Sequence, residues 1–481
     1  MLHSFMRKSF HFLSLTILGV LLFTPKLIAQ DAESQALKTQ PNIIVILADD
    51  LGYADVGFNG STDIPTPNID RIAREGVKFT NAYVSYAVCG PSRAGILTGR
   101  YQDRFGFSRN PLLAPNDPKM GLPLSEETLA DALGRVGYKS VALGKWHMGA
   151  HESLVPRKRG FTDFFGFLSG GHQYLPELWT LNDLTEARTQ YDGYNTKLLR
   201  NETRVEETEY LTDALSREAV NYIQHYKDAP FFMYLAYNAP HAPLQATPEY
   251  VERFDHIKDP KRKIYAAMVS AMDDGVGRVL ETLDSLKLAD NTLVFFLSDN
   301  GGPEHANASD NGLLRGEKGD LFEGGIHVPF ALRWPARLEG GKTYEKAISA
   351  LDIFATAINQ TSEPIQTKNT LDGVDLIPYL TEANSGDPHP YLFWRKFDQE
   401  EYAVRAANGL KFEIQKNQSY LFDLQHDLGE TNSILKERSE DSRSLKKQYS
   451  IWNMEMKDPV FLGLLQDKLY SRQNPNRFTT N

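Results

Sequence analysis

The stretch Asn42-Ile43-Ile44-Val45-Ile46-Leu47 decides the fold of this 481-residue chain. It is apolar after its first residue and rich in β-branched side chains, which is typical of a strand buried on both faces in a parallel sheet. The chain continues as Ala48-Asp49-Asp50-Leu51-Gly52-Tyr53. Open α/β sheets bind ligands at the carboxyl ends of their strands, and adjacent carboxylates there suit calcium or magnesium. Two aspartates after a strand are also common in turns and helix caps, so a metal site needs further ligands.

Further ligands follow a second predicted strand at residues 292–298. That strand ends in Asp299-Asn300-Gly301-Gly302, which adds a carboxylate and an amide oxygen. If both strands belong to one parallel sheet, Asp299 and Asn300 lie at the same edge as the first aspartate pair. Oxygen atoms from two strands then form an all-oxygen metal site.

Two more predicted strands lead into candidate catalytic side chains. Residues 140–143 precede Gly144-Lys145-Trp146-His147, where strand alternation places Lys145 and His147 on one side, facing a common pocket. Residues 231–236 precede a loop in which Pro240 and Pro243 flank His241 and stiffen the backbone. A rigid histidine there suits a general acid, or a hydrogen-bond partner, for a leaving oxygen. Taken singly, these three residues are more often ordinary surface or loop side chains.

The rest of the chain supplies helices and loops. Helical spacing and end signals predict helices within residues 66–76, 127–136, 212–226 and 261–286, and residues 77–83 alternate as in a half-buried strand. Residues 151–210 are rich in glycine, aromatic and charged residues and predict long loops over the cleft, where we expect substrate selection. In these loops His172 and Tyr174 are candidate sugar contacts, with packing inside the loop as their alternative role.

The only cysteine, Cys89, lies in Val88-Cys89-Gly90-Pro91-Ser92-Arg93-Ala94-Gly95-Ile96-Leu97-Thr98-Gly99-Arg100. Residues 92–97 predict a helix, with Pro91 near its first turn, where proline is tolerated. A nucleophile at a helix N-terminus faces free backbone N–H groups and the positive end of the helix dipole, which favours an anionic substrate. A buried inert thiol is the ordinary alternative for a lone cysteine. A plain cysteine nucleophile is another, but no local Cys-His signature accompanies it.

The N-terminus predicts export. Arg7 and Lys8 precede a largely apolar run over residues 10–23, and Leu27-Ile28-Ala29 offers a cleavage site, so residues 1–29 resemble a secretory signal peptide. The run is shorter than the roughly 20 residues that span a bilayer, which argues against a stable membrane anchor, although an uncleaved anchor is the alternative. We therefore expect a periplasmic or secreted protein. A single cysteine excludes an internal disulfide, and a net charge of −10 argues against a nucleic acid partner.

Several motifs in order resemble the type I, formylglycine-dependent sulfatases. They are the Cys-x-Pro-Ser-Arg core at 89–93 with Leu97-Thr98-Gly99-Arg100, Gly144-Lys145-Trp146-His147, Gly316-Glu317-Lys318-Gly319, and the late Leu421-Phe422-Asp423-Leu424. The resemblance implies an α/β fold, the alkaline-phosphatase-like α/β/α sandwich with a mostly parallel central sheet and a smaller C-terminal subdomain with an antiparallel sheet. We expect a catalytic domain at 30–380 and the subdomain at 381–481, with the boundary near 381–390. One departure is His327, where the family usually has arginine before Val-Pro.

The resemblance also implies a mechanism of sulfate ester hydrolysis. In the family a maturing, formylglycine-generating enzyme oxidises the cysteine matched by Cys89. One hydroxyl of the hydrated aldehyde attacks sulfur, and the other drives elimination of sulfate. Arg93 matches the residue that holds the modified side chain, and His147 and His241 match those that assist elimination and protonate the leaving oxygen. The matching calcium ligands are Asp49, Asp50, Cys89, Asp299 and Asn300, the matching sulfate contacts are Lys145 and Lys318, and Arg315 beside Lys318 is a further candidate substrate contact.

Three functions fit these motifs. The first is an exported sulfatase that acts on a sulfated carbohydrate or polysaccharide, which the loop-built pocket and the predicted export favour. The second is a phosphonate or phosphate ester hydrolase of the same superfamily, which can share the formylglycine motif. The third is a non-enzymatic glycan binder with an unconverted Cys89. A binder would not need the complete set of polar residues, so that set argues against the third function.

Overall fold

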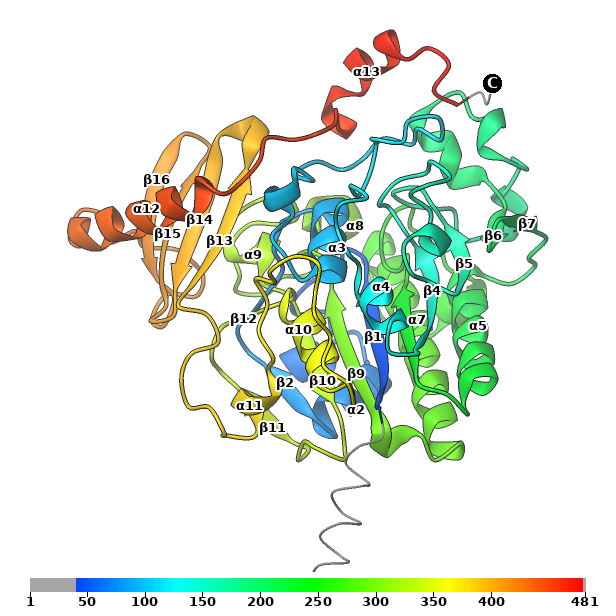
Figure 1. Ribbon diagram of the computed structural model, residues 1–481, viewed down its shortest axis with the longest axis horizontal. Coiled ribbons are helices and arrows are strands. Elements are labelled where there is room, and N and C mark those ends of the chain that lie inside the picture. Colours follow the sequence, from blue (N-terminus) through cyan, green and yellow to red (C-terminus); the bar gives the residue numbers. More distant parts are fainter. Residues whose placement is uncertain (1–39, 479–481) are drawn as a thin grey trace, which may run out of the picture. The chain divides into compact units, whose positions relative to one another are not determined.

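A ten-stranded sheet forms the centre of the structure, a computed structural model that describes residues 40–478. β1 (Asn42–Ala48) pairs in parallel with β9 (Thr292–Ser298) on one side and with β8 (Phe231–Ala236) on the other (Figure 1). The strand order is β11-β2-β10-β9-β1-β8-β4-β5-β6-β7. The predicted signal peptide, residues 1–29, lies outside the described residues.

The middle of this sheet is parallel and its edges are mixed. The strands β9, β1, β8, β4 and β5 all run in one direction, whereas β10, β6 and β7 each pair antiparallel with a neighbour. The mostly parallel sheet predicted from residues 42–47 is therefore confirmed. The remaining strands are β2 (Val77–Phe79), β4 (Lys139–Lys145), β5 (Asp163–Phe167), β6 (Leu198–Arg200), β7 (Thr203–Val205), β10 (Phe330–Arg333) and β11 (Lys342–Tyr344).

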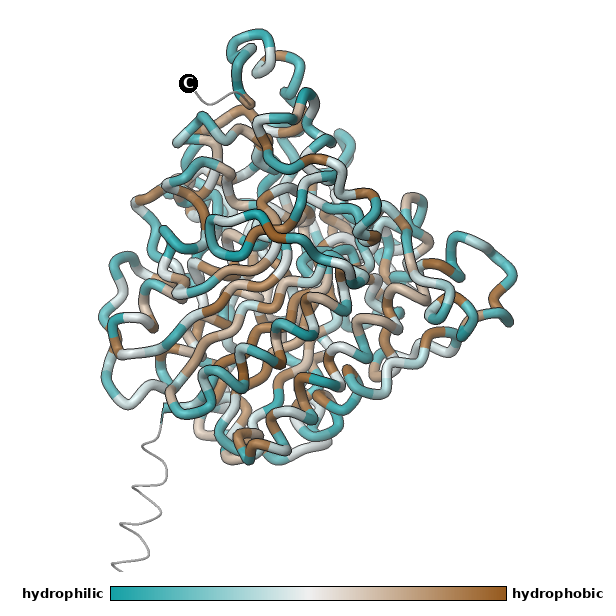
Figure 2. Tube along the Cα trace, turned by 90° about the vertical axis from the view of Figure 1, so that its right-hand side faces the viewer, coloured by the Kyte–Doolittle hydropathy of each residue, from teal (hydrophilic) through white to brown (hydrophobic). Residues whose placement is uncertain are grey.

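β1 lies in the middle because both of its faces are apolar. Ile43, Val45 and Leu47 belong to one hydrophobic core, and Ile44 and Ile46 belong to another. Each fully buried side chain of this size contributes about 1.5–3 kcal/mol relative to an exposed one. In Figure 2 the apolar colour concentrates along the strands and the hydrophilic colour along the outer turns.

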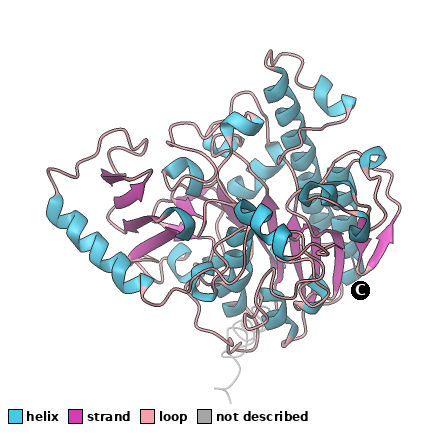
Figure 3. Ribbon diagram, turned by 90° about the horizontal axis from the view of Figure 1, so that it is seen from above, coloured by secondary structure: helices cyan, strands magenta, loops and turns pink. Residues whose placement is uncertain are grey.

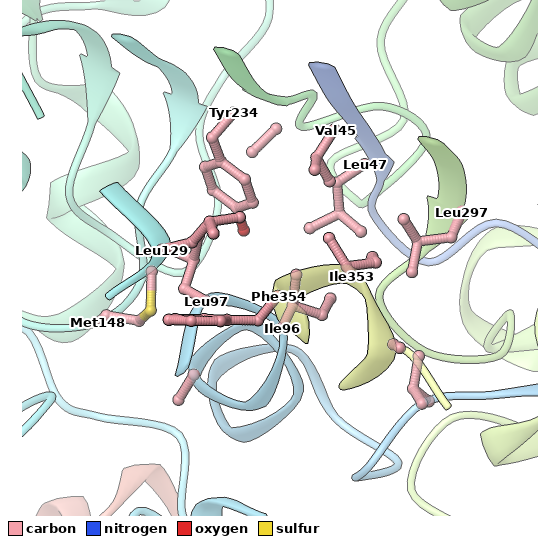
Figure 4. Packing of buried hydrophobic residues seen from close by; sticks show 14 of the residues in the cluster. Val45, Leu47, Ile96, Leu97, Leu129, Met148, Tyr234, Leu297, Ile353 and Phe354 are labelled. Atoms are coloured by element: carbon pink, nitrogen blue, oxygen red, sulfur yellow. The ribbon is translucent and has the colours of Figure 1, made fainter. Parts of the chain in front are cut away.

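Helices cover both faces of the sheet (Figure 3). The first core is closed by α3 (Cys89–Thr98), α4 (Leu129–Gly134) and α10 (Asp352–Asn359), and Figure 4 shows side chains of α3 and α10 packed beneath Val45 and Leu47. The second core is closed by α2 (Pro67–Arg74), α5 (Leu211–Tyr226) and α7 (Pro260–Ser285). These helices confirm the α/β/α arrangement and the helices predicted at 66–76, 127–136, 212–226 and 261–286.

The remaining helices within residues 40–478 are α6 (Pro248–Glu252), α8 (Glu304–Asn307), α9 (Glu323–Ile326), α11 (Ile377–Leu380), α12 (Ser439–Asn453) and α13 (Asp467–Gln473). No helix in this range combines the length and apolar character needed to cross a membrane.

The prediction of a single strand at residues 77–83 is wrong. The stretch forms β2 in the main sheet and then β3 (Ala82–Tyr83), which pairs with β12 (Ile348–Ser349) in a separate two-stranded sheet. Between them, Thr80 N–H donates to the Tyr344 carbonyl at 3.1 Å and the Asn81 carbonyl accepts from Ile348 at 3.0 Å. The side-chain pattern continues through this change of partner, which is why the sequence predicted one strand.

The prediction that residues 151–210 are loops is also wrong in part, because they contain β5, β6 and β7. The glycine in Phe164-Phe165-Gly166-Phe167 indicated a loop. In the structure it permits close strand pairing, since a Cβ at Gly166 would lie 2.1 Å from the carbonyl oxygen of Gly144 in β4. Sequence alone does not distinguish a glycine that breaks a strand from one that lets two strands approach.

A four-stranded antiparallel sheet follows, as predicted. It consists of β13 (Tyr391–Lys396), β14 (Glu401–Ala406), β15 (Leu410–Gln415) and β16 (Gln418–Asp423), and α12 packs on it through Leu445 and Trp452 (Figure 1). Residues 381–390 connect α11 to β13, at the predicted boundary. The division into domains 30–380 and 381–481 stays a prediction.

A buried charge cluster attaches this sheet to the segment that carries Lys318. Lys411 of β15 donates to the carbonyl of Leu321 at 2.8 Å, to Glu323 Oε1 at 3.0 Å and to Glu430 Oε1 at 2.7 Å. Burial raises the pKa of Glu430 to about 8 despite Lys411. Burial would also raise the pKa of Glu323, but Lys411 and His327 outweigh it and hold that pKa below its ordinary value. The Lys411 ammonium group thus compensates the charge of the buried Glu323 carboxylate.

Lys411→Met should lower the free energy of unfolding by about 3–5 kcal/mol, because removing one member of a buried ion pair leaves its partner uncompensated. Urea unfolding followed by circular dichroism measures the change. The control is Lys447→Met, at an exposed position of α12, which should stay within about 0.5 kcal/mol of wild type. Equal stability of the two variants would contradict the role assigned to Lys411.

A second ion pair anchors the connection between α11 and β13. His389 Nε2 lies 2.8 Å from Asp352 Oδ1 at the start of α10. Burial alone would lower the pKa of His389, but the charge of Asp352 and the hydrogen bonds between them raise it above the ordinary value. The folded state therefore binds this proton more tightly than the unfolded state does.

This pair predicts a pH-dependent stability. A raised pKa contributes stability that is complete below the unfolded value of about 6.5 and is lost as the pH rises through the folded value. The stability difference between wild type and His389→Gln should therefore be largest near pH 5.5 and decline above pH 6.5, measured as the urea midpoint. His426→Gln, at an exposed histidine, serves as control. A difference that grows with pH would contradict the assignment.

Candidate active site

Four parallel strands bring the candidate residues to one edge of the sheet. Asp49 and Asp50 follow β1, Lys145 ends β4, and Asp299 and Asn300 follow β9. His241 lies beyond β8, in the loop between the two prolines. Because the four strands are neighbours and run in one direction, their carboxyl ends converge, as expected for an open α/β sheet.

Buried ion pairs hold the carboxylates of this edge. Asp49 Oδ2 lies 2.5 Å from Lys145 Nζ, and Asp299 Oδ2 accepts from Arg93 Nε at 2.8 Å. Asp50 lies 2.7 Å from Lys318 Nζ. The Asp49, Lys145, Arg93 and Asp299 side chains are fully shielded from solvent, so each charge depends on its partner.

The carboxylates repel one another as well. Burial and the charge of Asp49 raise the pKa of Asp299 to about 6, in spite of Arg93. For Asp50, burial alone would raise the pKa, but Lys318, with His241 and Lys145, holds it below the ordinary value. A further positive charge at this edge would relieve the remaining repulsion.

The donor set fits a hard divalent cation. Oxygen atoms of Asp49, Asp50 and Asp299 lie within 4.8 Å of one another. Asn300 donates through Nδ2 to Asp50 Oδ1 at 2.7 Å, which leaves its Oδ1 for another partner. Asp49 Oδ1 and Asn300 Oδ1 are buried and accept no hydrogen bond within residues 40–478. Buried oxygens without donors are what a calcium or magnesium ion requires.

Cys89 faces the same cluster. It is the first residue of α3, after the extended residue Val88, and is only 2% exposed. Its Sγ lies within 4.8 Å of a carboxylate oxygen of Asp49 and a ring nitrogen of His241. Burial raises the pKa of the Cys89 thiol even though Lys145 and Lys318 oppose the shift. The predicted nucleophile and the predicted metal ligands are thus together.

Two histidines complete the cluster. His147 and Asp50 both have left-handed backbone conformations, with φ of 56° and 64°, a strain often found at functional sites. Burial, with Lys145 and Arg93, holds the pKa of His147 well below the ordinary value. His241 donates through Nδ1 to the carbonyl of Ala242 at 2.5 Å, so Nε2 faces Asp50 Oδ2 at 3.6 Å. Burial lowers the pKa of His241 to about 3, against the effect of Asp50.

The candidate sugar contacts His172 and Tyr174 are hydrogen-bonded within the protein. Both ring nitrogens of His172 are 2.8 Å from backbone carbonyl oxygens, and Tyr174 Oη donates to the carbonyls of Asn238 and His241 at 2.7 and 2.8 Å. Both side chains are fully buried, so their contacts are with the protein, and Tyr174 holds the loop that carries His241. Arg315 donates to the Glu430 carbonyl at 2.9 Å and lies over the Phe322 ring. These contacts occupy His172 and Tyr174 within the protein, whereas Arg315 is exposed; the sugar contacts predicted for the first two and the substrate contact predicted for Arg315 stay predictions.

His327, where the family usually has arginine, is buried and has a partner at each ring nitrogen. Nδ1 lies 2.9 Å from Glu323 Oε2, and Nε2 lies 2.8 Å from the carbonyl oxygen of Thr80. The tyrosine rings at 53 and 83 pack against it at 4.8 and 4.7 Å between centroids. The histidine thus fills its position with two polar contacts and aromatic packing.

Sequence reasoning missed two residues near the nucleophile. Asn110 Oδ1 accepts from the backbone N–H of Gly90 at 2.8 Å, which fixes the first turn of α3. Tyr194 lies close enough to Cys89 and Lys318 for their charges to act on its hydroxyl. Neither residue belongs to a motif or follows a strand, and both approach the site only through tertiary folding.

Comparisons with known proteins agree with this geometry. The sulfatase family model matches residues 41–362. The chain is 33% identical over 372 residues to human N-acetylgalactosamine-6-sulfatase, covering 74% of this chain and 68% of that protein. It is also 33% identical over 411 residues to the Escherichia coli (strain K12) protein "Uncharacterized sulfatase YdeN", covering 74% and 69%.

A solved structure is similar over nearly the whole chain. The crystal structure of Ps i-CgsB in complex with k-i-k-neocarrahexaose has a TM-score of 0.84 and 37% sequence identity to this chain. The match covers 92% of this chain and 100% of the chain in that crystal structure.

The donor set predicts stabilisation by calcium. A ligand that binds only the folded state at 100 times its dissociation constant stabilises that state by about 2.7 kcal/mol. Calcium added to chelator-treated protein should therefore raise the unfolding temperature, measured by differential scanning calorimetry. Asp299→Asn should abolish the shift, whereas Asp290→Asn, an exposed residue at the opposite end of β9, should retain it. An identical unfolding temperature in chelator and in calcium would contradict the metal site.

Proposed function

Because the chain belongs to the sulfatase family, and is thus a sulfuric ester hydrolase of alkaline-phosphatase-like fold, we propose that it is an exported enzyme that removes sulfate from a carbohydrate. We further propose that it uses formylglycine formed at position 89 and a calcium ion. The observation that carries this proposal is the position of Cys89 Sγ, within 4.8 Å of oxygen and nitrogen atoms of Asp49 and His241.

The state of the thiol supports conversion of Cys89. A cysteine nucleophile reacts as the thiolate, and catalytic thiols have a lowered pKa. Here burial raises the pKa of Cys89, so the unmodified side chain is mainly a neutral thiol near pH 7. A formylglycine-generating or sulfatase-maturing enzyme is therefore the partner that we propose.

The cations around position 89 suit a sulfate ester. Lys145 and Lys318 each form one ion pair, with Asp49 and Asp50, and their ammonium groups act on Cys89. In a site shielded from water, fixed charges of this kind stabilise charge that develops in the transition state. Arg93 is fully buried and lies against Asp299 and Asp49, so it orients the carboxylates and the residue at position 89.

The proposed metal ligands are Asp49, Asp50, Asp299, Asn300 and the modified residue 89. When bound, calcium supplies a positive charge that activates a hydroxyl of the hydrated aldehyde for attack on sulfur. Lys145, Lys318 and Arg93 each hold one of the three carboxylates. Residues whose positions are fixed by such surrounding contacts suit a metal site.

The two histidines have separate positions and separate proposed roles. His241 has its Nδ1 occupied by the Ala242 carbonyl, so only Nε2 is available to hydrogen-bond to, or protonate, the leaving oxygen. The negative charge of a bound sulfate ester favours the protonated ring. His147 Nδ1 is buried and has no hydrogen-bond partner within residues 40–478, which leaves a free nitrogen for proton transfer during elimination of sulfate.

A sulfated glycan is the proposed substrate class. The similar crystal structure holds a neocarrahexaose, and a relative at 33% identity is named for N-acetylgalactosamine 6-sulfate. The family match favours sulfate over phosphate or phosphonate esters, and the assembled set of carboxylates, cations and histidines disfavours a glycan binder without activity. Residues 1–29 are the proposed export signal, with periplasmic or secreted location and no stable membrane anchor.

The test is turnover of defined esters. Matured protein with calcium should release sulfate from 4-methylumbelliferyl sulfate and from at least one member of a panel containing k-i-k-neocarrahexaose and N-acetylgalactosamine 6-sulfate, measured by ion chromatography. Peptide mass spectrometry should find an aldehyde at position 89, and Cys89→Ala should lower kcat by at least about a thousandfold, since it removes the nucleophile.

Two controls accompany this test. Protein made without a maturing enzyme should retain the thiol and lack turnover, although it differs from the active protein at one side chain only. The Cys89→Ala protein should keep the wild-type circular dichroism spectrum. Faster turnover of 4-methylumbelliferyl phosphate than of the sulfate would favour the phosphate esterase, and an unmodified thiol in active protein would exclude the formylglycine mechanism.

A further inference from the structure

A cavity of about 220 Å³ opens beside the nucleophile. Its floor is residues 86–88, directly before Cys89, and Gly319, directly after Lys318, lies at its side. The two segments are joined where the Gly319 N–H donates to the carbonyl of Ala87 at 2.9 Å. Asn110, which fixes the first turn of α3, also lines the cavity. The cavity is thus lined by residues that adjoin Cys89 and Lys318 in the chain.

The C-terminal segment of the chain builds one wall. Leu464 N–H donates to the carbonyl of Asn110 at 3.0 Å, and Gln466 donates through Nε2 to Asp398 Oδ2 at 3.1 Å and accepts at Oε1 from Gly463 at 3.0 Å. The wall is therefore fixed on both sides of Leu465. Leu465 itself lines the cavity and is 77% exposed, so its side chain is available to a ligand.

A balanced ion pair also lines the cavity. Arg109 Nε and Nη2 donate to the two carboxylate oxygens of Asp398 at 2.8 and 2.5 Å, and Nη1 donates to the carbonyl of Phe461. Lys396, also at the cavity, is paired with Glu401. Both cations are thus paired with carboxylates. The cavity offers donors, acceptors and an apolar surface, and its three charged groups, Arg109, Lys396 and Asp398, are all in ion pairs.

These features describe a site for an uncharged sugar ring. Carbohydrates present hydroxyl groups at the edge of the ring and C–H groups on its faces, and small-molecule sites combine apolar surface with a few fixed polar groups. The volume is below the roughly 300–1,000 Å³ typical of drug-sized ligands, so about one ring fits.

We propose that this cavity binds the uncharged sugar unit next to the one whose sulfate is removed, with Leu465 against its apolar face and Gln466 and Gln399 at its hydroxyls. The inference rests on the proposed function, since it assumes a glycan substrate. It assigns to the C-terminal segment, remote in sequence from every catalytic motif, the selection of oligosaccharides over small esters.

Leu465→Ala and Gln466→Ala test the proposal. We measure kcat/KM for 4-methylumbelliferyl sulfate, which has no neighbouring sugar unit, and for the oligosaccharide of the panel that wild type desulfates fastest. The ratio of the oligosaccharide value to the aryl sulfate value should fall about tenfold in each variant, the effect of losing one good contact in a pocket. Leu469→Ala, at a leucine of α13 that is 48% exposed and lies outside the cavity, should keep the wild-type ratio.

Other outcomes overturn the proposal and separate it from the proposed function. Equal loss on both substrates would show a structural effect on the whole site, and no loss on either would exclude contact with the glycan. If high salt brought the substrate preference of the variants up to that of wild type, the contact would be with a charged unit, because salt screens ionic contacts. Wild-type turnover of the aryl sulfate with no panel member desulfated would overturn the glycan substrate and, with it, the cavity.

Discussion

The structure depends on keeping three carboxylates buried at one edge of a parallel sheet. Asp49, Asp50 and Asp299 are there because their strands are neighbours and point the same way. Buried like charges cost several kcal/mol each unless they are paired. Lys145, Arg93 and Lys318 supply the pairing from a strand, a helix and a loop, which ties those three elements to the sheet edge. The charges that chemistry requires therefore also determine how the surrounding segments dock.

Local sequence patterns predicted the parts of the fold that are set locally. The β1 run and the long helices follow from apolar spacing, and the residues after β1, β4, β8 and β9 lie together because parallel strands end at one edge of the sheet. The patterns failed where pairing decides the structure. Gly166 belongs to a strand because β4 approaches it closely, and residues 77–83 divide because their partner strand changes. Neither pairing can be deduced from the local sequence alone.

The site shows the same limit. Motif residues such as Lys318 and Cys89 were predictable from their neighbours in the chain, and the structure brings them together. Asn110 and Tyr194 were not, because they reach the nucleophile through long-range folding and carry no motif. His172 and Tyr174 were chosen for residue type in a region expected to be loop, but burial gave them internal hydrogen-bond partners. Residue type identifies possible chemistry, and only packing decides which side chains can use it.

The C-terminal wall has an evolutionary consequence. Residues 464–466 are held by a few backbone and side-chain hydrogen bonds, and none of these bonds involves the three buried carboxylates. With the role proposed for the cavity, exchange of this short stretch would change which oligosaccharides bind, while the buried, paired charges stay unchanged. Sequence change in this C-terminal segment would then cost little stability, whereas change among the paired charges at the sheet edge would cost much.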